Sequence, residues 1–205
     1  MKKLLWLFSG LILLLAALFL GAPYYLGIKA EQSLNKQHEI LSHTSFLQVE
    51  SRRYERGWFS SHETTVVRFK PTFLAQLQDK LPDNIKTILT QPITLESNIK
   101  HSLFANGSMP VRAVVDTEFV FQPESREILQ RFFGSQAPAS LRNVIQLNGN
   151  GRLTWQVPAF KYQELSGIAI NWQGLEGSTD YTKYFTEYQS SLNNPGLTIT
   201  LADKG

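Results

Sequence analysis

Residues 93–121 read ITLESNIKHSLFANGSMPVRAVVDTEFVF, and this stretch decides the fold. Apolar and polar side chains alternate along Ile93–Leu103 and again along Val111–Phe121, as they do in strands with one buried face. Asn106-Gly107 lies between the two segments and is a strong hairpin signal. The stretch therefore predicts two antiparallel strands joined by a turn.

Similar strands are expected on both sides of this hairpin, at Leu47–Tyr54, His62–Lys70, Val144–Asn148, Arg152–Val157, Leu165–Trp172 and Leu197–Leu201. Asn148-Gly149-Asn150-Gly151 marks a second hairpin turn. Short helices are expected at Thr72–Leu81, before Pro82, and at Glu124–Phe133, between Pro123 and Gly134. Tyr181–Leu192 fits a helix as well as a strand, and we favour a strand because its neighbours form a meander.

The N-terminal segment has the composition of a membrane anchor. No charged residue occurs in Leu4–Ile28, and about 20 apolar residues suffice for a helix to cross a bilayer core of about 30 Å. Trp6 and Tyr24-Tyr25 occupy the positions of the two aromatic belts. Lys2-Lys3 favours a cytoplasmic N-terminus, so the rest of the chain is expected on the outer side.

A cleaved signal peptide is the alternative to an anchor. Ala22 could precede the cleavage point, but Leu20 would then lie at −3 and Pro23 at +1, which are both poor for cleavage. We therefore expect an uncleaved anchor, with Pro23 ending or kinking its helix.

The predicted fold class is mainly β (α+β): a transmembrane helix followed by an antiparallel β-rich domain with two or three short helices. Its parts are a leader and anchor at residues 1–28, a helical neck at 29–45 and an extracytoplasmic domain at 46–205. Ala30, Leu34 and Leu41 recur in the neck at near-heptad spacing. This spacing favours a helix that leads into the domain, and the segment is too short to claim as a self-association seam.

Composition excludes several classes of protein. The 205 residues include no cysteine, which excludes disulfide scaffolds, cysteine nucleophiles and thiolate metal sites. The net charge is +3, and Lys2 and Lys3 supply most of it, so the body of the chain lacks the basic face of a nucleic-acid binder.

No motif for catalysis, cofactor binding or metal ligation is present in the sequence. His38, His43, His62 and His101 show no metal-ligand spacing, and we expect ordinary surface or edge positions for them. His62 and Glu63 are adjacent on a predicted strand, so their side chains point to opposite faces. There is neither a nucleophile elbow nor a phosphate-binding loop. We expect no catalytic residue, no cofactor and no metal.

The densest cluster of charged and aromatic side chains is residues 52–61, RRYERGWFSS. Gly57 is expected to adopt a positive φ at a strand reversal, with Tyr54 and Trp58 paired across an aromatic-clamped hairpin. The functional hypothesis is a basic site near the membrane that contacts lipid headgroups or a partner protein. Its residues would be Arg52, Arg53, Tyr54, Arg56, Trp58 and Phe59.

Tyr54-Glu55-Arg56-Gly57-Trp58-Phe59-Ser60-Ser61, with Gly27-x-x-Ala30-Glu31 behind the anchor, resembles the YdgA-like family of bacterial inner-membrane proteins of unknown function. Weaker matches follow in chain order at Ile99-Lys100-His101, Leu165-Ser166-Gly167, Trp172-Gln173-Gly174-Leu175 and Pro195-Gly196-Leu197. Where this chain has His101-Ser102-Leu103 the family continues His-Gly-Pro. The resemblance implies an uncleaved helix, a domain outside the cytoplasm of which residues 46–205 are the front part, and no catalytic residues.

The expected function is that of a single-pass, non-enzymatic inner-membrane protein whose periplasmic domain binds a lipid or protein partner. Lipid handling predicts an elongated sheet with one apolar concave face. Two alternatives stay open. An envelope hydrolase with dispersed catalytic groups predicts a deep pocket with two titratable groups of perturbed pKa. A self-associating structural or sensory module predicts a homo-oligomer formed through exposed strands.

Overall fold

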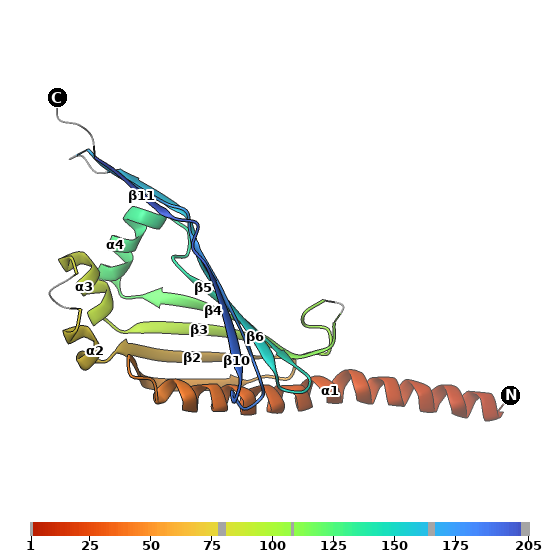
Figure 1. Cartoon of the computed structure of the whole chain (residues 1–205). Helices are drawn as coiled ribbons and strands as arrows, with labels where there is room; N and C mark the ends of the chain where they lie inside the picture. The colour runs from red at the N-terminus through yellow and green to blue at the C-terminus, as the bar shows by residue number, and fades with distance from the viewer. Residues whose placement is uncertain (1, 78–80, 108, 164–166, 202–205) are drawn as a thin grey trace.

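The computed structural model describes residues 2–77, 81–107, 109–163 and 167–201. One long helix, α1 (Lys2–Ser42), lies with its C-terminal half against a strongly twisted antiparallel sheet (Figure 1). The other helices are α2 (Pro71–Ala75), α3 (Asp83–Thr90) and α4 (Pro123–Phe133). The strands are β1 (Leu47–Arg56), β2 (Ser60–Phe69), β3 (Ile93–Lys100), β4 (Val111–Phe121), β5 (Ser140–Gln146), β6 (Gly151–Val157), β7 (Phe160–Gln163), β8 (Ile168–Trp172), β9 (Leu175–Tyr181), β10 (Tyr188–Asn193) and β11 (Leu197–Leu201).

Among the described residues, eight strands form one sheet in the order β1-β2-β3-β4-β5-β6-β9-β10, and all neighbours are antiparallel. A smaller sheet has the order β11-β8-β7. Because neighbouring strands alternate in direction, the connections after β1, β3, β5 and β9 lie at one end of the large sheet. Helices α2, α3 and α4 connect strands at the opposite end (Figure 1). The predicted mainly β fold with an N-terminal apolar helix is confirmed.

Most of the predicted elements are present, and Val111–Phe121 has the predicted bounds. Tyr181–Leu192 contains the end of β9, a turn and most of β10, so its strand prediction holds only at its two ends. Helix α3 was not predicted. The helix predicted at Thr72–Leu81 is present only at its start, because α2 ends at Ala75. Residues 78–80 of that prediction lie outside the described residues, as do residues 165–166 of the strand predicted at Leu165–Trp172.

Pro23 was predicted to end or kink the helix; α1 continues through Pro23, so the first of these alternatives was wrong. A proline removes one helical hydrogen bond and weakens the turn before it. Here the indole N–H of Trp58 donates to the carbonyl of Leu20 (2.8 Å), and Nδ1 of His101 bonds to the carbonyl of Pro23 itself (3.0 Å). Contacts from the sheet therefore support the helix where the proline weakens it.

A narrow apolar seam joins α1 to the sheet. Ala30 and Leu34 are buried there against side chains of β3, β4 and β5, namely Ile99, Ala113, Val115 and Ile145. The fully buried methyl group of Ala30 lets the helix backbone lie close to the strands. The predicted neck helix thus leads into the domain, and the sheet of the same chain covers Ala30 and Leu34.

Polar side chains hold α1 on both sides of this seam. On the β1–β2 side the contacts are Glu31–Arg56 (3.0 Å), Asn35–Arg52 (2.6 Å) and His38–Glu63 (2.6 Å). On the β4–β5 side they are Ser33–Arg112 (2.7 Å) and Gln37–Asn143 (3.0 Å). Because hydrogen bonds are directional, these pairs fix the rotation of α1 about its own axis.

His101 locks the end of the seam nearest the apolar half of α1. Its ring is fully buried, and while Nδ1 donates to the Pro23 carbonyl, Nε2 bonds to the Ser61 hydroxyl (2.9 Å). Gly27 lies against the ring, since a Cβ at this position would be 2.8 Å from Cε1 of His101. The prediction of ordinary surface or edge histidines was therefore wrong for His101.

Gly27→Ala is expected to lower the free energy of unfolding by about 1–3 kcal/mol, the usual cost of forcing an extra methyl group into a packed site. Helix propensity alone predicts the opposite sign, because alanine is favoured over glycine by about 1 kcal/mol. Gly21→Ala is the matched control, since no described group beyond the helix's own backbone lies within 4 Å of that position. Thermal unfolding in detergent, followed by circular dichroism, measures both. Unchanged or higher stability of the Gly27→Ala protein would contradict a tight contact between Gly27 and the His101 ring.

Candidate functional site

A cleft of about 400 Å³ lies between the C-terminal part of α1 and the sheet face turned toward it, called the inner face below. Leu34 is buried in the seam, whereas Leu41, two helical turns further along the same side of α1, is half-buried and lines the cleft. Helix and sheet therefore meet closely near Ala30 and leave room near Leu41.

The walls of the cleft are largely apolar. The apolar side chains come from α1, from the six strands β1 to β6 and from the turn after β9: Leu34, Ile40, Leu41, Leu47, Val67, Leu95, Val115, Phe119, Leu141, Leu153 and Phe185. Side chains from opposite ends of the chain thus form one continuous apolar surface.

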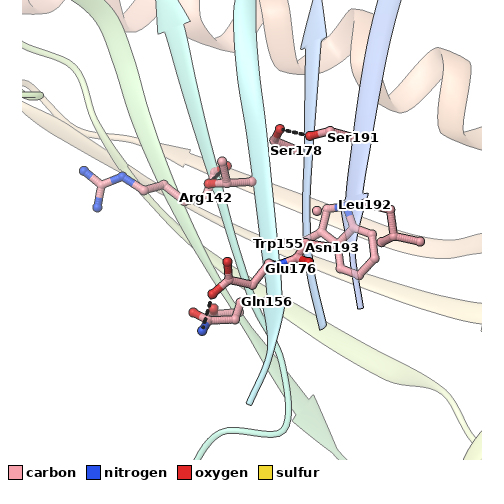
Figure 2. A pocket seen from close by; sticks show the side chains of 11 residues that line it. Arg142, Trp155, Gln156, Glu176, Ser178, Ser191, Leu192 and Asn193 are labelled. Atoms are coloured by element: carbon pink, nitrogen blue, oxygen red, sulfur yellow. Dashed lines mark hydrogen bonds between the residues drawn. The ribbon is translucent and has the colours of Figure 1, made fainter. Parts of the chain in front are cut away.

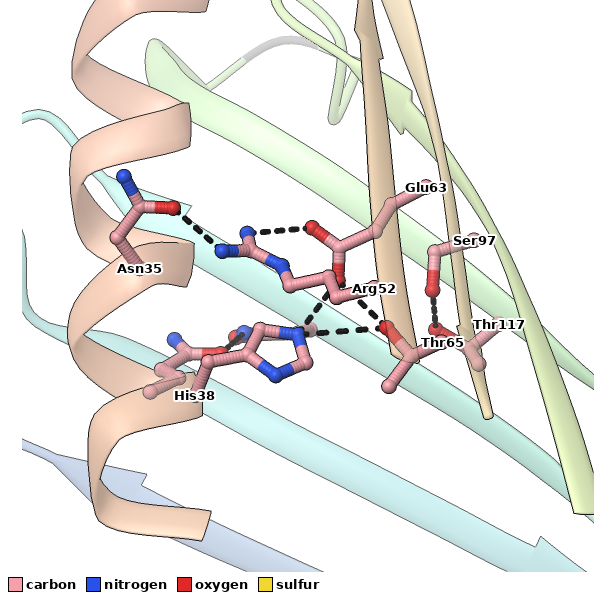
Figure 3. A network of polar contacts seen from close by, with 9 residues as sticks. Asn35, His38, Arg52, Glu63, Thr65, Ser97 and Thr117 are labelled. Atoms are coloured by element: carbon pink, nitrogen blue, oxygen red, sulfur yellow. Dashed lines mark hydrogen bonds and ion pairs between the residues drawn. The ribbon is translucent and has the colours of Figure 1, made fainter. Parts of the chain in front are cut away.

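A charged network lies on one wall of the cleft (Figure 3). The buried carboxylate of Glu63 accepts hydrogen bonds from Nε2 of His38 (2.6 Å), Arg52 (2.7 Å) and the Thr65 hydroxyl (3.2 Å), and Arg52 also donates to Asn35 (2.6 Å). Burial by itself raises the pKa of Glu63, but the hydrogen bonds from His38 and Arg52 outweigh burial and hold the pKa below its ordinary value of 4.5. Glu63 is therefore an ionised acceptor rather than a proton donor.

The His38–Glu63 pair differs from the base and orienting carboxylate of nucleophilic catalysis. In those sites the carboxylate binds one ring nitrogen and the nucleophile binds the other. Here the carboxylate of Glu63 (2.6 Å) and the hydroxyl of Thr65 (3.5 Å) both face Nε2, and Nδ1 has no hydrogen-bond partner among the described residues. The ring therefore does not connect the carboxylate to a hydroxyl.

A closed ring of hydrogen bonds forms a second polar group beside the cleft. Gln37 donates to the Tyr181 hydroxyl (2.9 Å), Tyr181 donates to Asn143 (2.7 Å), and Asn143 donates back to Gln37 (3.0 Å). Burial raises the pKa of Tyr181 to about 12, which keeps its hydroxyl protonated as a donor. All three side chains donate and accept within the ring, so this group joins α1 to the sheet.

A bacterial family of unknown function (DUF945) has a family model that matches residues 1–205, the whole of this chain. The chain belongs to this family. No curated protein and no solved structure matches it. The expectation of a bacterial family of unknown function is confirmed, and the same chain has a helix long and apolar enough to cross a membrane.

The six residues predicted to contact a partner are divided among three places. Arg52 and Arg56 point toward α1, where they pair with Glu63 (2.7 Å) and Glu31 (3.0 Å). Tyr54 also lies on this side and packs against the apolar seam. These three side chains therefore serve the contact between α1 and the sheet.

The remaining three lie away from the cleft. Arg53 is 80% exposed and pairs with Glu55 (2.7 Å). Trp58 and Phe59 form the tip of the β1–β2 hairpin and contact the apolar half of α1 through Tyr24 and Phe19. Contact of the six residues with a ligand stays a prediction.

Two details of the predicted hairpin were wrong. Trp58 pairs with the ring of Tyr24 in α1 (centroids 5.0 Å apart) and not with Tyr54. Gly57 is not among the described glycines with positive φ. Glycine is required there for a different reason, because a Cβ would lie 2.3 Å from the carbonyl oxygen of Ser60.

A second depression, of about 470 Å³, lies on β5, β6, β9 and β10 (Figure 2). Its polar side chains bond to one another, as in the pairs Gln156–Glu176 (3.2 Å) and Ser178–Ser191 (2.8 Å). These groups satisfy each other, whereas the cleft beside α1 offers a continuous apolar wall. We therefore take the cleft as the candidate site.

The charged wall of this site was not predicted from the sequence. His38 and Glu63 belong to different elements and meet only when α1 packs on β2. One signal was available, because alternation places Glu63 on the same side of its strand as Thr65 and Val67. The predicted separation of His62 and Glu63 onto opposite faces agrees with the burial of Glu63 beside a half-exposed His62.

Glu63→Gln is expected to lower the free energy of unfolding by about 2–3 kcal/mol, because Arg52 and His38 lose their ionised acceptor in a largely buried setting. Chemical denaturation measures the loss. Asp180→Asn is the control, since it removes an acceptor from an ion pair with Arg152 in which both side chains are more than half exposed, and such pairs contribute little.

The same variant has a pH signature. The folded-state pKa of Glu63 is depressed, so its stabilisation is complete above its ordinary value of 4.5 and is lost as the pH falls through the folded-state value. The wild-type protein is therefore expected to lose stability more steeply in acid than Glu63→Gln. Parallel stability curves for the two proteins would show that the network does not hold an ionised Glu63.

Proposed function

We propose that this chain is a single-pass, non-enzymatic protein of the bacterial inner membrane that binds a lipid-like amphiphile in the cleft between α1 and the sheet. The amphiphile would place an acyl chain against the apolar wall. Lys2-Lys3 favours a cytoplasmic N-terminus, which puts the sheet and the cleft in the periplasm.

The surface of α1 supports the membrane part of this proposal. From Leu11 to Leu20 the large apolar side chains are each at least 50% exposed. Exposed apolar patches of this kind drive association in water, and a bilayer covers them. The run is also long enough, because about 20 helical residues cross the bilayer core.

The cleft carries the binding part of the proposal. Its volume of about 400 Å³ lies in the range of about 300–1,000 Å³ that is typical of ligand sites. Each methylene group that leaves water for the apolar wall contributes about 0.8 kcal/mol. The charged wall with Glu63, Arg52 and His38 lies beside the apolar surface, an arrangement that suits a molecule with one apolar and one polar end.

The position of the cleft suggests a carrier or holding role. From Pro23 to Leu41, α1 rises by about 27 Å at about 1.5 Å per residue. An amphiphile in the cleft would therefore be outside the bilayer. We propose binding without catalysis because Glu63 is ionised and because the Glu63 carboxylate and the Thr65 hydroxyl both face the same nitrogen of His38.

Photo-crosslinking in native membranes tests this function. With benzoylphenylalanine in place of Phe119, which lines the cleft, irradiation is expected to give a lipid adduct that mass spectrometry identifies. Glu118, the preceding residue on β4, is exposed and points to the other face, so the same probe there is expected to give no such adduct.

A matched pair of bulky substitutions provides the second control. Leu95→Trp fills the cleft and is expected to reduce the Phe119 adduct several-fold, whereas Asn98→Trp adds an indole to the outer face of the same strand and is expected to leave it unchanged. Absence of a lipid adduct at position 119, or capture of a protein alone, would contradict an amphiphile as the ligand.

A further inference from the structure

Four connections of the large sheet lie at the end nearest the apolar half of α1: 57–59 after β1, 101–110 after β3 (108 lies outside the described residues), 147–150 after β5 and 182–187 after β9. The connections after β1 and β3 adjoin each other near Pro23, since the His101 amide donates to the Phe59 carbonyl (3.1 Å) and the His101 ring bonds to the Pro23 carbonyl (3.0 Å). The connection after β5 lies further along α1, because Arg112 donates both to the Leu147 carbonyl and to Ser33 (2.7 Å each). The connections after β1 and β3 are together called the turn edge below, and the second extends beyond the strands on the side of the N-terminal half of α1 (Figure 1).

Large apolar side chains are exposed along this turn edge. Their exposed fractions are 52% for Trp58, 47% for Phe59, 63% for Phe104 and 68% for Met109. Residues from two separate connections thus present an apolar surface on one edge of the sheet, while Ile99 on the adjoining strand is fully buried.

The turn edge is continuous with the membrane-spanning part of α1. The Trp58 indole donates to the carbonyl of Leu20 and packs on Tyr24, and Phe59 packs on Phe19 with ring centroids 6.4 Å apart. A span that begins near the N-terminus and needs about 20 residues ends close to these contacts. Trp58 therefore lies at the depth where the bilayer meets water, the preferred location of tryptophan in membrane proteins.

We propose that the turn edge rests on the outer leaflet of the membrane, with Phe104 and Met109 at the level of the lipid headgroups beside Trp58 and Phe59. The partner is the bilayer surface itself. The inference rests on the proposed anchoring of α1, and it goes beyond that anchoring because it assigns a second contact between membrane and domain. Two contacts, one spanning and one peripheral, fix the tilt of the sheet and the height of the cleft above the bilayer.

Site-directed spin labelling tests the inference on the full chain, which contains no native cysteine. Single variants Phe104→Cys and Met109→Cys are labelled and reconstituted into phosphatidylethanolamine–phosphatidylglycerol vesicles. Power saturation then compares accessibility to oxygen, which concentrates in lipid, with accessibility to a water-soluble nickel complex. Labels at these positions are expected to show an oxygen-to-nickel ratio several-fold above that of Ile199→Cys, an exposed position (58%) on β11 in the small sheet.

Leu13→Cys separates failure of this inference from failure of the anchor. This position lies in the proposed span, and its label is expected to show the highest ratio of the set. A high ratio at position 13 with ratios at 104 and 109 equal to that at 199 would overturn the turn-edge contact alone. A water-like ratio at position 13 would overturn the anchor and the turn-edge contact together.

Discussion

The packing of α1 against the inner face of the sheet is the contact on which the rest of the structure depends. Eight strands about 4.8 Å apart make a sheet roughly 34 Å wide, whereas a helix with its side chains is only about 10–12 Å across. One helix therefore covers only part of the inner face. Ala30 and Leu34 close the seam where helix and sheet lie nearest, and the cleft occupies part of the face beyond it. The cleft exists because the helix is narrower than the sheet. Its lining is apolar because the inner face of the sheet has to be covered from water.

Much of the fold could be predicted because its signals are local. Alternation along Val111–Phe121 and the turn residues that separate the strands require no knowledge of distant parts of the chain. The continuation of α1 through Pro23 could not be predicted in this way, because Trp58 and His101, which support the helix there, follow much later in the sequence. Tyr181–Leu192 was ambiguous because its aromatic residues are distributed over the end of one strand, a turn and the next strand, and their spacing also fits a helix. Strand β7 spans four residues, too few for a period to show.

The candidate site was less predictable, for a different reason. Alternation within residues 52–56 already implies that Arg52, Tyr54 and Arg56 share one side of a strand and that Arg53 lies on the other. What the sequence could not show is the partner of each arginine. Glu63 and Glu31 become partners only once α1 crosses the sheet, and the same crossing turns His38 from an apparently ordinary surface residue into part of the cleft wall. The chemistry of the site is thus a product of tertiary packing.

Because α1 is uninterrupted, it fixes both the distance between its two ends and the rotation of one end relative to the other about the helix axis. A helix turns by about 100° with every residue, so one residue inserted between Tyr24 and Ala30 would swing Ala30 and Leu34 away from the strands while Tyr24 stayed on Trp58. A substitution in this segment changes a single contact. After an insertion or deletion, the contact at Tyr24 and the contacts at Ala30 and Leu34 can no longer form at the same time. A change close to a whole number of turns, such as seven residues, nearly restores the angle, but it shifts Tyr24 by about 10 Å along the helix axis relative to Trp58. The segment between membrane and sheet therefore sets the rotation of the sheet relative to the spanning part of the helix. Its length is constrained far more tightly than that of a flexible tether.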